Sequence, residues 1–448
     1  MCLCVFGMSE EGSTPSHFVA ELAVDAWRSF EPVPELQSHS HLVTEEGNFI
    51  KGCKISPDGC CVLTASERST LHIMDIPFDM DPSAPSSFDR SRNPLVPSVS
   101  VQEGESLYDF AWYPLMHSAV PASCGFVTST KDRPIHMWDA FTGKLRASYR
   151  AFDYADEIVA ACSLAFNPAG THLFAGYTHH LRRFDVAIPG RECECRKTWQ
   201  SGSGRRKRGA DGGQRGLFSC LACPTDPSLP LLAAGTYTGT VGLYDADSLE
   251  LVSVWPAHSR GVSQLLFSRN SALLITAGRR SQDILVWDYR QLGATEPLYT
   301  FCREGDTNQR LSMDVDCSGR FLLSGNTNGT VSCYDLCTGE PLGAWLCHPG
   351  DVVNGVSFHP TLPAFACSSG TRRVAFPKCE ATGHTDSDSS SSEEELVEAQ
   401  DQDIPPPCVK FFSVEKQYAW VPWSSLPSTD AMQVDDGEGS NQPPDREI

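Results

Sequence analysis

The chain has 448 residues, with 56 acidic against 35 basic side chains and a formal net charge of −21. It has no apolar run of about 18 residues, and its start, MCLCVFGMSEEG, lacks basic residues. We therefore expect neither a membrane span nor a secretory signal. The 19 Cys are irregularly spaced, and many fall in strand-like segments such as SCLAC. This pattern favours buried thiols in a reducing compartment over a disulfide framework.

The negative charge is concentrated near the C-terminus. Residues 380–448 hold 16 acidic and 3 basic side chains, so the rest of the chain is only mildly acidic and its basic residues can still cluster. The segment TDSDSSSSEEE resembles an acidic kinase substrate, although a plain solvated loop explains it equally well. The phosphorylation candidates are Ser387, Ser389, Ser390, Ser391 and Ser392.

One pattern recurs along the chain: a strand ends in an aromatic residue and Asp, and a turn follows. The clearest copy is IHMWDAFTGK (135–144), in which Gly143 suits the left-handed backbone of a tight turn. Successive Asp residues lie 64, 46, 60, 43 and 47 positions apart, whereas one WD-repeat blade takes about 40–45 residues. We therefore predict an all-β, seven-bladed WD-repeat β-propeller. Its blade positions are Asp75, Trp138, Asp139, Phe184, Asp185, Tyr244, Asp245, Trp287, Asp288, Tyr334 and Asp335.

The chain divides into a propeller and two tails. Residues 1–16 are polar and expected to be disordered, as are the acidic residues 424–448. Residues 17–47 are expected to supply a strand, for which Ala26–Phe30 is the candidate, that pairs into the last blade and closes the ring. The propeller then covers 48–423. Its expected blades are 48–89, 105–150, 157–200, 216–256, 261–302, 309–347 and 355–413, the last interrupted by an acidic insert at 380–407 before the strand Val409–Ser413.

Enzyme signatures do not occur in the sequence. We find no phosphate-binding GxxxxGK[ST], no zinc-binding HExxH and no GxSxG, so we expect no catalytic residues and no cofactor. His258 precedes the fifth blade, where such repeats use a histidine to tie a loop to the strand Trp, and we expect that structural role. Four cysteines have loosely metal-like spacing, but buried thiols are favoured over zinc. They are Cys193, Cys195, Cys220 and Cys223.

Basic residues fall in two classes of loop that open on the same face of such a propeller: the loop before each first strand, and the loop between the second and third strands. Arg suits forked phosphate contacts, so this face is a candidate for RNA binding, although Arg is also common in exposed turns. The run RRKR at 205–208 is alternatively a nuclear-import signal. The candidates are Arg68, Lys131, Arg133, Arg150, Arg205, Arg206, Lys207, Arg208, Arg260, Arg279, Arg280, Arg303, Arg310, Arg372 and Arg373.

A second function stays open. The residues WDYR (287–290) fit the Trp-Asp-x-Arg pattern of substrate receptors in cullin ubiquitin ligases, a short and common pattern. This alternative predicts that a cullin adaptor binds the chain in a manner that depends on Arg290.

Several stretches outside the repeat consensus resemble the telomerase Cajal body protein family. They are NFIKGCKISPDG (48–59), PIHMWDAFTGKLRASYRAF (134–152), DVAIPGREC (185–193), TNQR (307–310) and NGVSFHPTLP (354–363). The resemblance covers about 48–375, and the inserts at 201–216 and 380–407 depart from it.

The resemblance implies a non-catalytic scaffold that recognises the Cajal-body box of H/ACA small Cajal-body RNAs and of telomerase RNA. It also implies nuclear and Cajal-body localisation, with telomeres and cytoplasm as further sites, and a role in telomerase assembly and telomere maintenance. The partners that it implies are the H/ACA pseudouridine synthase complex, the telomerase reverse transcriptase complex, coilin and survival-motor-neuron components, and the cytosolic chaperonin. No residue that contacts RNA is carried over from the family.

Overall fold

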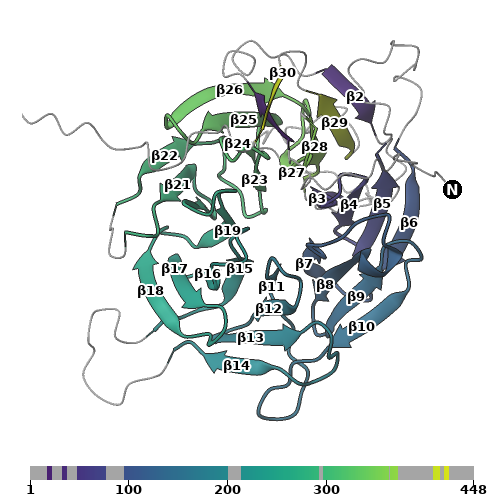
Figure 1. Ribbon diagram of the computed structural model, residues 1–448, viewed down its shortest axis with the longest axis vertical. Coiled ribbons are helices and arrows are strands. Elements are labelled where there is room, and N and C mark those ends of the chain that lie inside the picture. Colours follow the sequence, from purple (N-terminus) through teal and green to yellow (C-terminus); the bar gives the residue numbers. More distant parts are fainter. Residues whose placement is uncertain are drawn as a thin grey trace, which may run out of the picture.

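The computed structural model describes residues 18–22, 33–37, 48–76, 95–199, 213–291, 296–362, 364–371, 407–413 and 418–422. Seven four-stranded antiparallel sheets stand like blades around a central opening (Figure 1). Within the described residues, no helix is long and apolar enough to cross a membrane. The predicted all-β, seven-bladed propeller is confirmed.

The first six blades each follow the chain from the inner strand to the outer strand (Figure 1). Blade one contains β3 (Ile50–Ile55), β4 (Cys61–Ser66), β5 (Thr70–Asp75) and β6 (Pro97–Gln102). Blade two contains β7 (Leu107–Trp112), β8 (Gly125–Thr130), β9 (Ile135–Asp139) and β10 (Leu145–Tyr149). Blade three contains β11 (Ser163–Phe166), β12 (His172–Gly176), β13 (His180–Asp185) and β14 (Glu194–Lys197).

The next three blades have the same order of strands. Blade four contains β15 (Phe218–Ala222), β16 (Leu231–Thr236), β17 (Thr240–Asp245) and β18 (Leu251–Pro256). Blade five contains β19 (Val262–Phe267), β20 (Leu274–Gly278), β21 (Asp283–Trp287) and β22 (Tyr299–Cys302). Blade six contains β23 (Met313–Val315), β24 (Phe321–Gly325), β25 (Thr330–Asp335) and β26 (Glu340–Leu346).

Blade seven is built from both ends of the chain. Its inner strands β27 (Val353–Phe358), β28 (Ala364–Ser369) and β29 (Val409–Ser413) are joined by β2 (Val33–Gln37), which pairs antiparallel with β29. The expected closing strand, Ala26–Phe30, lies outside the described residues, and the strand in the closing position is β2 instead. A separate pair is formed by β1 (Phe18–Leu22) and β30 (Tyr418–Pro422).

The expected end of blade one was wrong, and the expected insert and tails lie largely outside the described residues. Blade one does not end at residue 89, because its outer strand β6 runs to Gln102. The alternating sequence PSVSVQ carries the strand pattern of β6. The acidic insert 380–407 lies almost entirely outside the described residues, as do 1–16 and 424–448.

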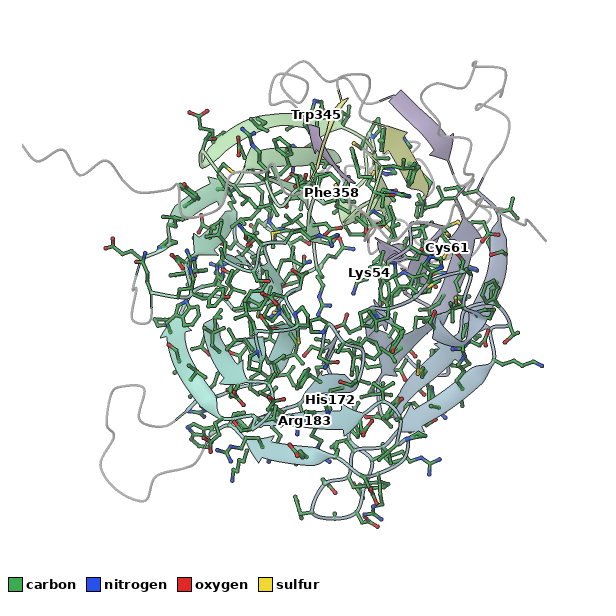
Figure 2. All side chains as sticks on the ribbon, in the orientation of Figure 1. Lys54, Cys61, His172, Arg183, Trp345 and Phe358 are labelled. Atoms are coloured by element: carbon green, nitrogen blue, oxygen red, sulfur yellow. The ribbon has the colours of Figure 1, made fainter. Side chains whose placement is uncertain are left out.

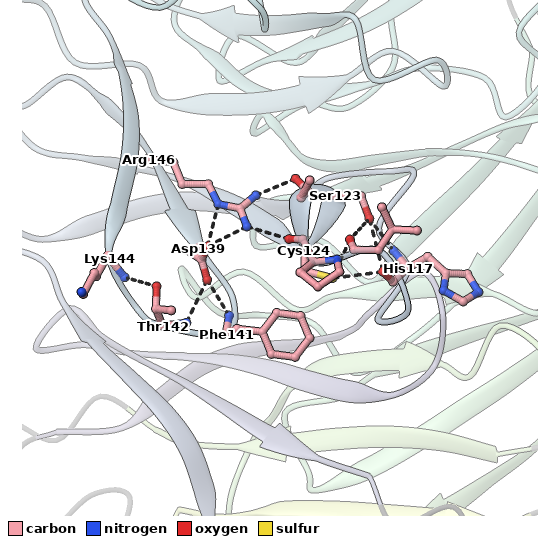
Figure 3. Close-up of polar contacts among 11 residues, drawn as sticks. His117, Ser123, Cys124, Asp139, Phe141, Thr142, Lys144 and Arg146 are labelled. Atoms are coloured by element: carbon pink, nitrogen blue, oxygen red, sulfur yellow. Dashed lines mark hydrogen bonds and ion pairs between the residues drawn. The ribbon is translucent and has the colours of Figure 1, made fainter. Parts of the chain in front are cut away.

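The repeated Asp closes a turn at the end of the third strand. In blade two, Asp139 accepts hydrogen bonds from the amides of Phe141 and Thr142, 2.9 and 2.8 Å long, and two from the guanidinium of Arg146 (Figure 3). Although partial burial raises the pKa of Asp139, these bonds outweigh that effect and hold it below its usual value. Arg146 also donates to two carbonyls of the loop before β8. The Asp therefore fixes both the turn and the neighbouring loop.

A second device, seen in blades two and five, ties the loop before the blade to its middle strands. In blade five, Thr276 bridges His258 and the indole of Trp287, with contacts of 2.9 and 3.1 Å. The expected tie between His258 and Trp287 is thus relayed by a hydroxyl. Burial lowers the pKa of His258 to about 4, so this histidine is neutral at pH 7. In blade two, Glu103 takes the position of the histidine and contacts the indole of Trp138 at 3.1 Å.

The apolar core lies between neighbouring blades. One cluster packs Leu63 and Ile73 of blade one against Phe110 and Phe126 of blade two. Similar clusters join the later blades around the ring. Since each cluster is shared, no blade has a complete core without its neighbour.

The inner strands are joined into a closed ring of side-chain hydrogen bonds. At each of the seven blade junctions, a side chain of one inner strand bonds the backbone of the next inner strand. The contacts are Lys54 to Phe110, Asp109 to Leu164, Ser163 to Phe218, Ser219 to Val262, Gln264 to Met313, Asp314 to Phe358 and Ser357 to Ile55. Each such bond contributes only about 0.5–1.5 kcal/mol to the free energy of unfolding. We therefore assign these bonds mainly to orienting neighbouring blades.

Candidate nucleic-acid interface

The two loop classes lie together on one face of the propeller. Backbone hydrogen bonds join them directly, as from Lys131 to Ser106 in blade two and from Thr327 to Glu304 in blade six. In blade five, Arg279 donates to Gly261 over 2.8 Å, and Arg280 donates to Thr307 over 3.3 Å. The loops of this face are therefore joined to one another by backbone hydrogen bonds.

Three predicted arginines converge on this face. Arg260, Arg279 and Arg280 line a depression together with Asn308. Arg260 comes from the loop before β19, the other two arginines from the β20–β21 turn, and Asn308 from the loop before β23. One carboxylate approaches, since Asp306 lies 3.5 Å from Nε of Arg280. Three arginines and an asparagine thus line the depression with one carboxylate nearby, and these residue types carry donors suited to a phosphate.

An exposed tyrosine stands beside this depression. Tyr237, in the turn after β16, is 44% exposed, and the guanidinium of Arg279 lies 5.3 Å from its ring centroid. Gly261, with φ +102°, packs so closely on the backbone of Tyr237 that a Cβ would lie 3.0 Å from its Cα. Glycine at position 261 therefore lets the loop that contains Arg260 pack closely against the turn that contains Tyr237.

A second aromatic–cation group adjoins the first. The guanidinium of Arg215, in the loop before β15, lies 5.0 Å from the ring of Trp199, which also contacts the ring of His179 at 5.4 Å. The hydroxyl of Thr238 donates to the carbonyl of Arg215 over 2.8 Å, and Thr238 directly follows Tyr237. The face therefore offers two neighbouring aromatic rings with arginines against them.

Other predicted basic residues are exposed on the same loops but do not line the depression. Arg68, Lys131, Arg133 and Arg150 belong to blades one and two and their following loops. Lys131 lies 3.9 Å from the carboxylate of Asp132, which offsets part of its charge. Six further candidates lie outside the described residues: Arg205, Arg206, Lys207, Arg208, Arg372 and Arg373. The phosphorylation candidates Ser387, Ser389, Ser390, Ser391 and Ser392 also lie outside them.

Arg303 is not available to a ligand, which corrects the sequence interpretation. It is only 4% exposed and donates to Ser324 and to the carbonyl of Leu311. Burial lowers its pKa to about 10. In blade six, Arg303 takes the place that His258 has in blade five, bonding the hydroxyl that faces the third strand. The loop position was correct, but the side chain turns into the blade.

The guanidinium of Arg310 also forms hydrogen bonds within the protein. From the loop before β23, its guanidinium donates to Asp109 of blade two over 3.3 Å and to the carbonyl of Ser219 in blade four over 2.8 Å. It lines the central channel, whose wall includes residues of all seven inner strands. Lys54 faces the same opening (Figure 2), where burial lowers its pKa. We therefore assign Arg310 to holding the channel together rather than to the loop face.

The sequence interpretation missed Tyr237, Asn308, Trp199 and Arg215. A signal existed for Tyr237, because an aromatic residue in the turn GTYTGT has no strand neighbour to pack against. Asn308 belongs to TNQR, a stretch that no repeat pattern requires. Trp199 comes shortly before the 201–216 insert and Arg215 lies within it, and neither was considered apart from the insert.

Two further features bear on the alternatives. Arg290 forms a forked contact with Asp288, 2.9 and 3.1 Å long, at the opposite end of β21 from Arg280. The side chain of Arg290 is 58% exposed, so the WDYR pattern stays a hypothesis for that other face. Among the described residues, no group of three or more His, Cys, Asp or Glu could hold a metal ion. Burial raises the pKa of both Cys220 and Cys223 to about 12, as for inert buried thiols.

Comparisons with known proteins agree with this architecture. A family model for the WD domain, G-beta repeat, matches residues 249–288, which span parts of blades four and five. The chain is 40% identical over 358 residues to telomerase Cajal body protein 1 of Rattus norvegicus, covering 78% of this chain and 64% of that protein. The chain is a WD-repeat relative of the telomerase Cajal body proteins.

Two more telomerase Cajal body proteins extend the likeness. The Homo sapiens protein is 39% identical over 367 residues, covering 80% of this chain and 64% of the human protein. The Drosophila melanogaster homolog is 34% identical over 334 residues, covering 73% of this chain and 58% of its own length. The chain thus spans under two thirds of the length of these relatives, and the similarity includes most of the propeller.

Proposed function

We propose that this chain is a non-catalytic scaffold that binds RNA on its arginine-bearing loop face. The observation that carries the proposal is the convergence of Arg260, Arg279 and Arg280 on one depression of that face. The names of the relatives, telomerase Cajal body proteins, indicate the setting. For this chain we propose the Cajal-body box of H/ACA small Cajal-body RNAs and telomerase RNA as the RNA target.

The local arginines and exposed ring of the loop face support RNA over a basic protein as the ligand. The chain as a whole carries a charge of −21, which repels a polyanion at long range, so RNA binding needs a local concentration of positive charge. The depression provides three guanidinium groups and one carboxylate within one small area. Sequence-specific RNA recognition uses unpaired bases, which stack on aromatic rings while Arg holds the phosphates. Exposed rings accompany the arginines on this face.

The biological setting follows from the same proposal. The scaffold would bring its RNA to Cajal bodies in the nucleus and support telomerase assembly and telomere maintenance, with telomeres and cytoplasm as further locations. The proposed partners are the H/ACA pseudouridine synthase complex, the telomerase reverse transcriptase complex, coilin and survival-motor-neuron components, and the cytosolic chaperonin. No cofactor is needed, because the proposed role involves binding only.

The test is a titration of the purified full chain with an H/ACA hairpin that carries the box in its terminal loop. The control RNA has the same stem and a scrambled loop of equal length. We expect tighter binding to the box-bearing hairpin, with affinity that falls as salt rises because phosphate contacts release counterions. Equal affinity for both hairpins would contradict sequence recognition by this chain. Absence of binding to either would mean that RNA contact belongs to a partner.

A further inference from the structure

The arginine depression has an aromatic ring beside it, so groups suited to a phosphate and to a base adjoin on this face. The three arginine side chains and Asn308 come from three loops that backbone bonds join, as from Arg279 to Gly261 and from Arg280 to Thr307. Arg260, Arg280 and Asn308 are exposed, and Arg279 is half-buried. The donors are therefore held in place but open to a ligand.

Tyr237 distinguishes this depression from a plain anion site. Its ring is 44% exposed and adjoins the guanidinium of Arg279, which also lines the depression. Three of the exposed large side chains among the described residues are tyrosines: Tyr108, Tyr154 and Tyr237. Of these three, only Tyr237 has an arginine guanidinium over its ring. A free phosphate or a phosphorylated side chain needs the arginines but not an exposed ring beside them.

We propose that the arginine depression binds one backbone phosphate of the RNA and that the ring of Tyr237 stacks on an unpaired base next to that phosphate. This inference rests on the proposed function and adds the chemical unit that the site reads: one unpaired nucleotide, rather than a duplex. A base paired within a helix is covered by its neighbours, so only a loop or a bulge offers a base face to the ring. Arg279 contacts both halves of the site, since it faces the ring and the depression.

The experiment combines single-position changes in the RNA with single-residue changes in the protein. The loop nucleotides of the box-bearing hairpin are replaced one at a time by an abasic nucleotide, which removes the base but keeps the phosphate. Each RNA is titrated against wild type, Tyr237→Ala, Tyr237→Phe and Arg260→Ala. Arg196→Ala is the matched control, because Arg196 is exposed on β14 at the blade edge and pairs with Glu250. Thermal melting checks that every variant folds.

The expected result is a coupling at one loop position. There the abasic change weakens binding to wild type by about 5- to 150-fold, the range of base–aromatic stacking. Tyr237→Ala loses a similar factor on the intact hairpin and shows no further loss on that abasic hairpin, whereas Tyr237→Phe behaves like wild type. Arg260→Ala weakens all of the hairpins alike, and Arg196→Ala changes none.

Other results would overturn the inference without touching the proposed function. If wild type binds the box-bearing hairpin selectively but Tyr237→Ala shows the same loss at every loop position, or none, the RNA uses another part of the face. If a phosphoserine peptide competes for the depression and Tyr237→Ala has no effect on it, the depression is a phosphoprotein site. If wild type does not bind the hairpin at all, the proposed function itself fails.

Discussion

Arg310 and Asp109 meet across the central channel, with 3.3 Å between Nη1 and Oδ1, although they belong to blades six and two. The same guanidinium also bonds the carbonyl of Ser219 in blade four. One side chain thus connects three blades that are not neighbours in the ring. It complements the ring of bonds between adjacent inner strands.

We predict that Arg310→Ala lowers the free energy of unfolding by about 1–3 kcal/mol, the range for a lost hydrogen bond to a charged group. RNA affinity, measured well below the melting temperature, should not change. Urea denaturation and the hairpin titration check the two parts. A variant that melts like wild type but binds RNA more weakly would return Arg310 to the set of ligand-binding residues. The double variant with Asp109→Asn should cost less than the sum of the two single changes, because the pair acts together.

The strand tryptophans should differ in their contribution to stability. Trp287 is 4% exposed and Trp138 is half-buried. Trp287→Ala should cost about 3–5 kcal/mol, a large part of an ordinary stability of about 5–15 kcal/mol, and Trp138→Ala less. Trp287→Phe keeps most of the apolar contact and loses the bond to Thr276, so it should cost about 1 kcal/mol. Equal unfolding midpoints for Trp287→Ala and wild type would show that this indole is not part of the blade core.

Stability should fall as the pH falls below about 6.5, in part through His258. Burial holds its folded pKa near 4, below the unfolded value of about 6.5. Between these two pKa values the unfolded chain binds a proton that the folded chain excludes. The free energy of unfolding therefore falls by up to about 1.4 kcal/mol for each pH unit of acidification. Above pH 6.5 this contribution is constant, and below pH 4 the loss is complete.

The measurement is urea unfolding at pH 7.5, 6 and 5 for wild type and for His258→Gln. The variant should lose less stability than wild type over this range, whatever its stability at pH 7.5 after the change to the bond with Thr276. His348, whose pKa burial lowers to about 3, makes a similar contribution in blade seven and remains in both proteins. Parallel curves for the two proteins would show that His258 titrates normally in the folded state.

Reversing charge on the loop face should weaken RNA binding. The double change Arg279→Glu and Arg280→Glu removes two proposed phosphate contacts, and each lost contact should flatten the salt dependence by a slope of about 0.7. Arg280 is exposed and Arg279 is half-buried in a surface turn, so the melting temperature should change little. The comparison is with Arg196→Glu at two salt concentrations. Equal affinities and slopes for both proteins would place the RNA elsewhere.

Much of the fold could be predicted from the sequence, because one physical requirement repeats in it. Most blades have an aromatic residue that fills the space to the neighbouring blade and an Asp that holds the turn, as at Trp138 and Asp139. The closing strand could not be placed in the same way. VPELQ alternates no more clearly than AWRSF, and its partner strand lies at the far end of the chain.

The candidate site was harder to predict for a different reason. A loop position gives the face on which a residue starts, but not the direction in which its side chain turns. Arg279 and Arg280 reach the surface, whereas Arg303 turns inward to a buried hydroxyl and Arg310 crosses the channel. Only the packing around each loop decides between these outcomes, and that packing involves residues from several blades.

The pairing of β2 with β29 has a consequence for how the protein is made. Val33 leaves the ribosome about 380 residues before its partner Ser413, a delay of about 20–80 s at ordinary synthesis rates. During that time the last blade is absent, the ring is open, and a nascent strand with free backbone groups waits beside an incomplete core. Newly made chains therefore pass through a long interval in which aggregation competes with closure of the ring. A compartment that isolates single chains would help this protein more than it would help a protein whose strands pair in the order of their synthesis.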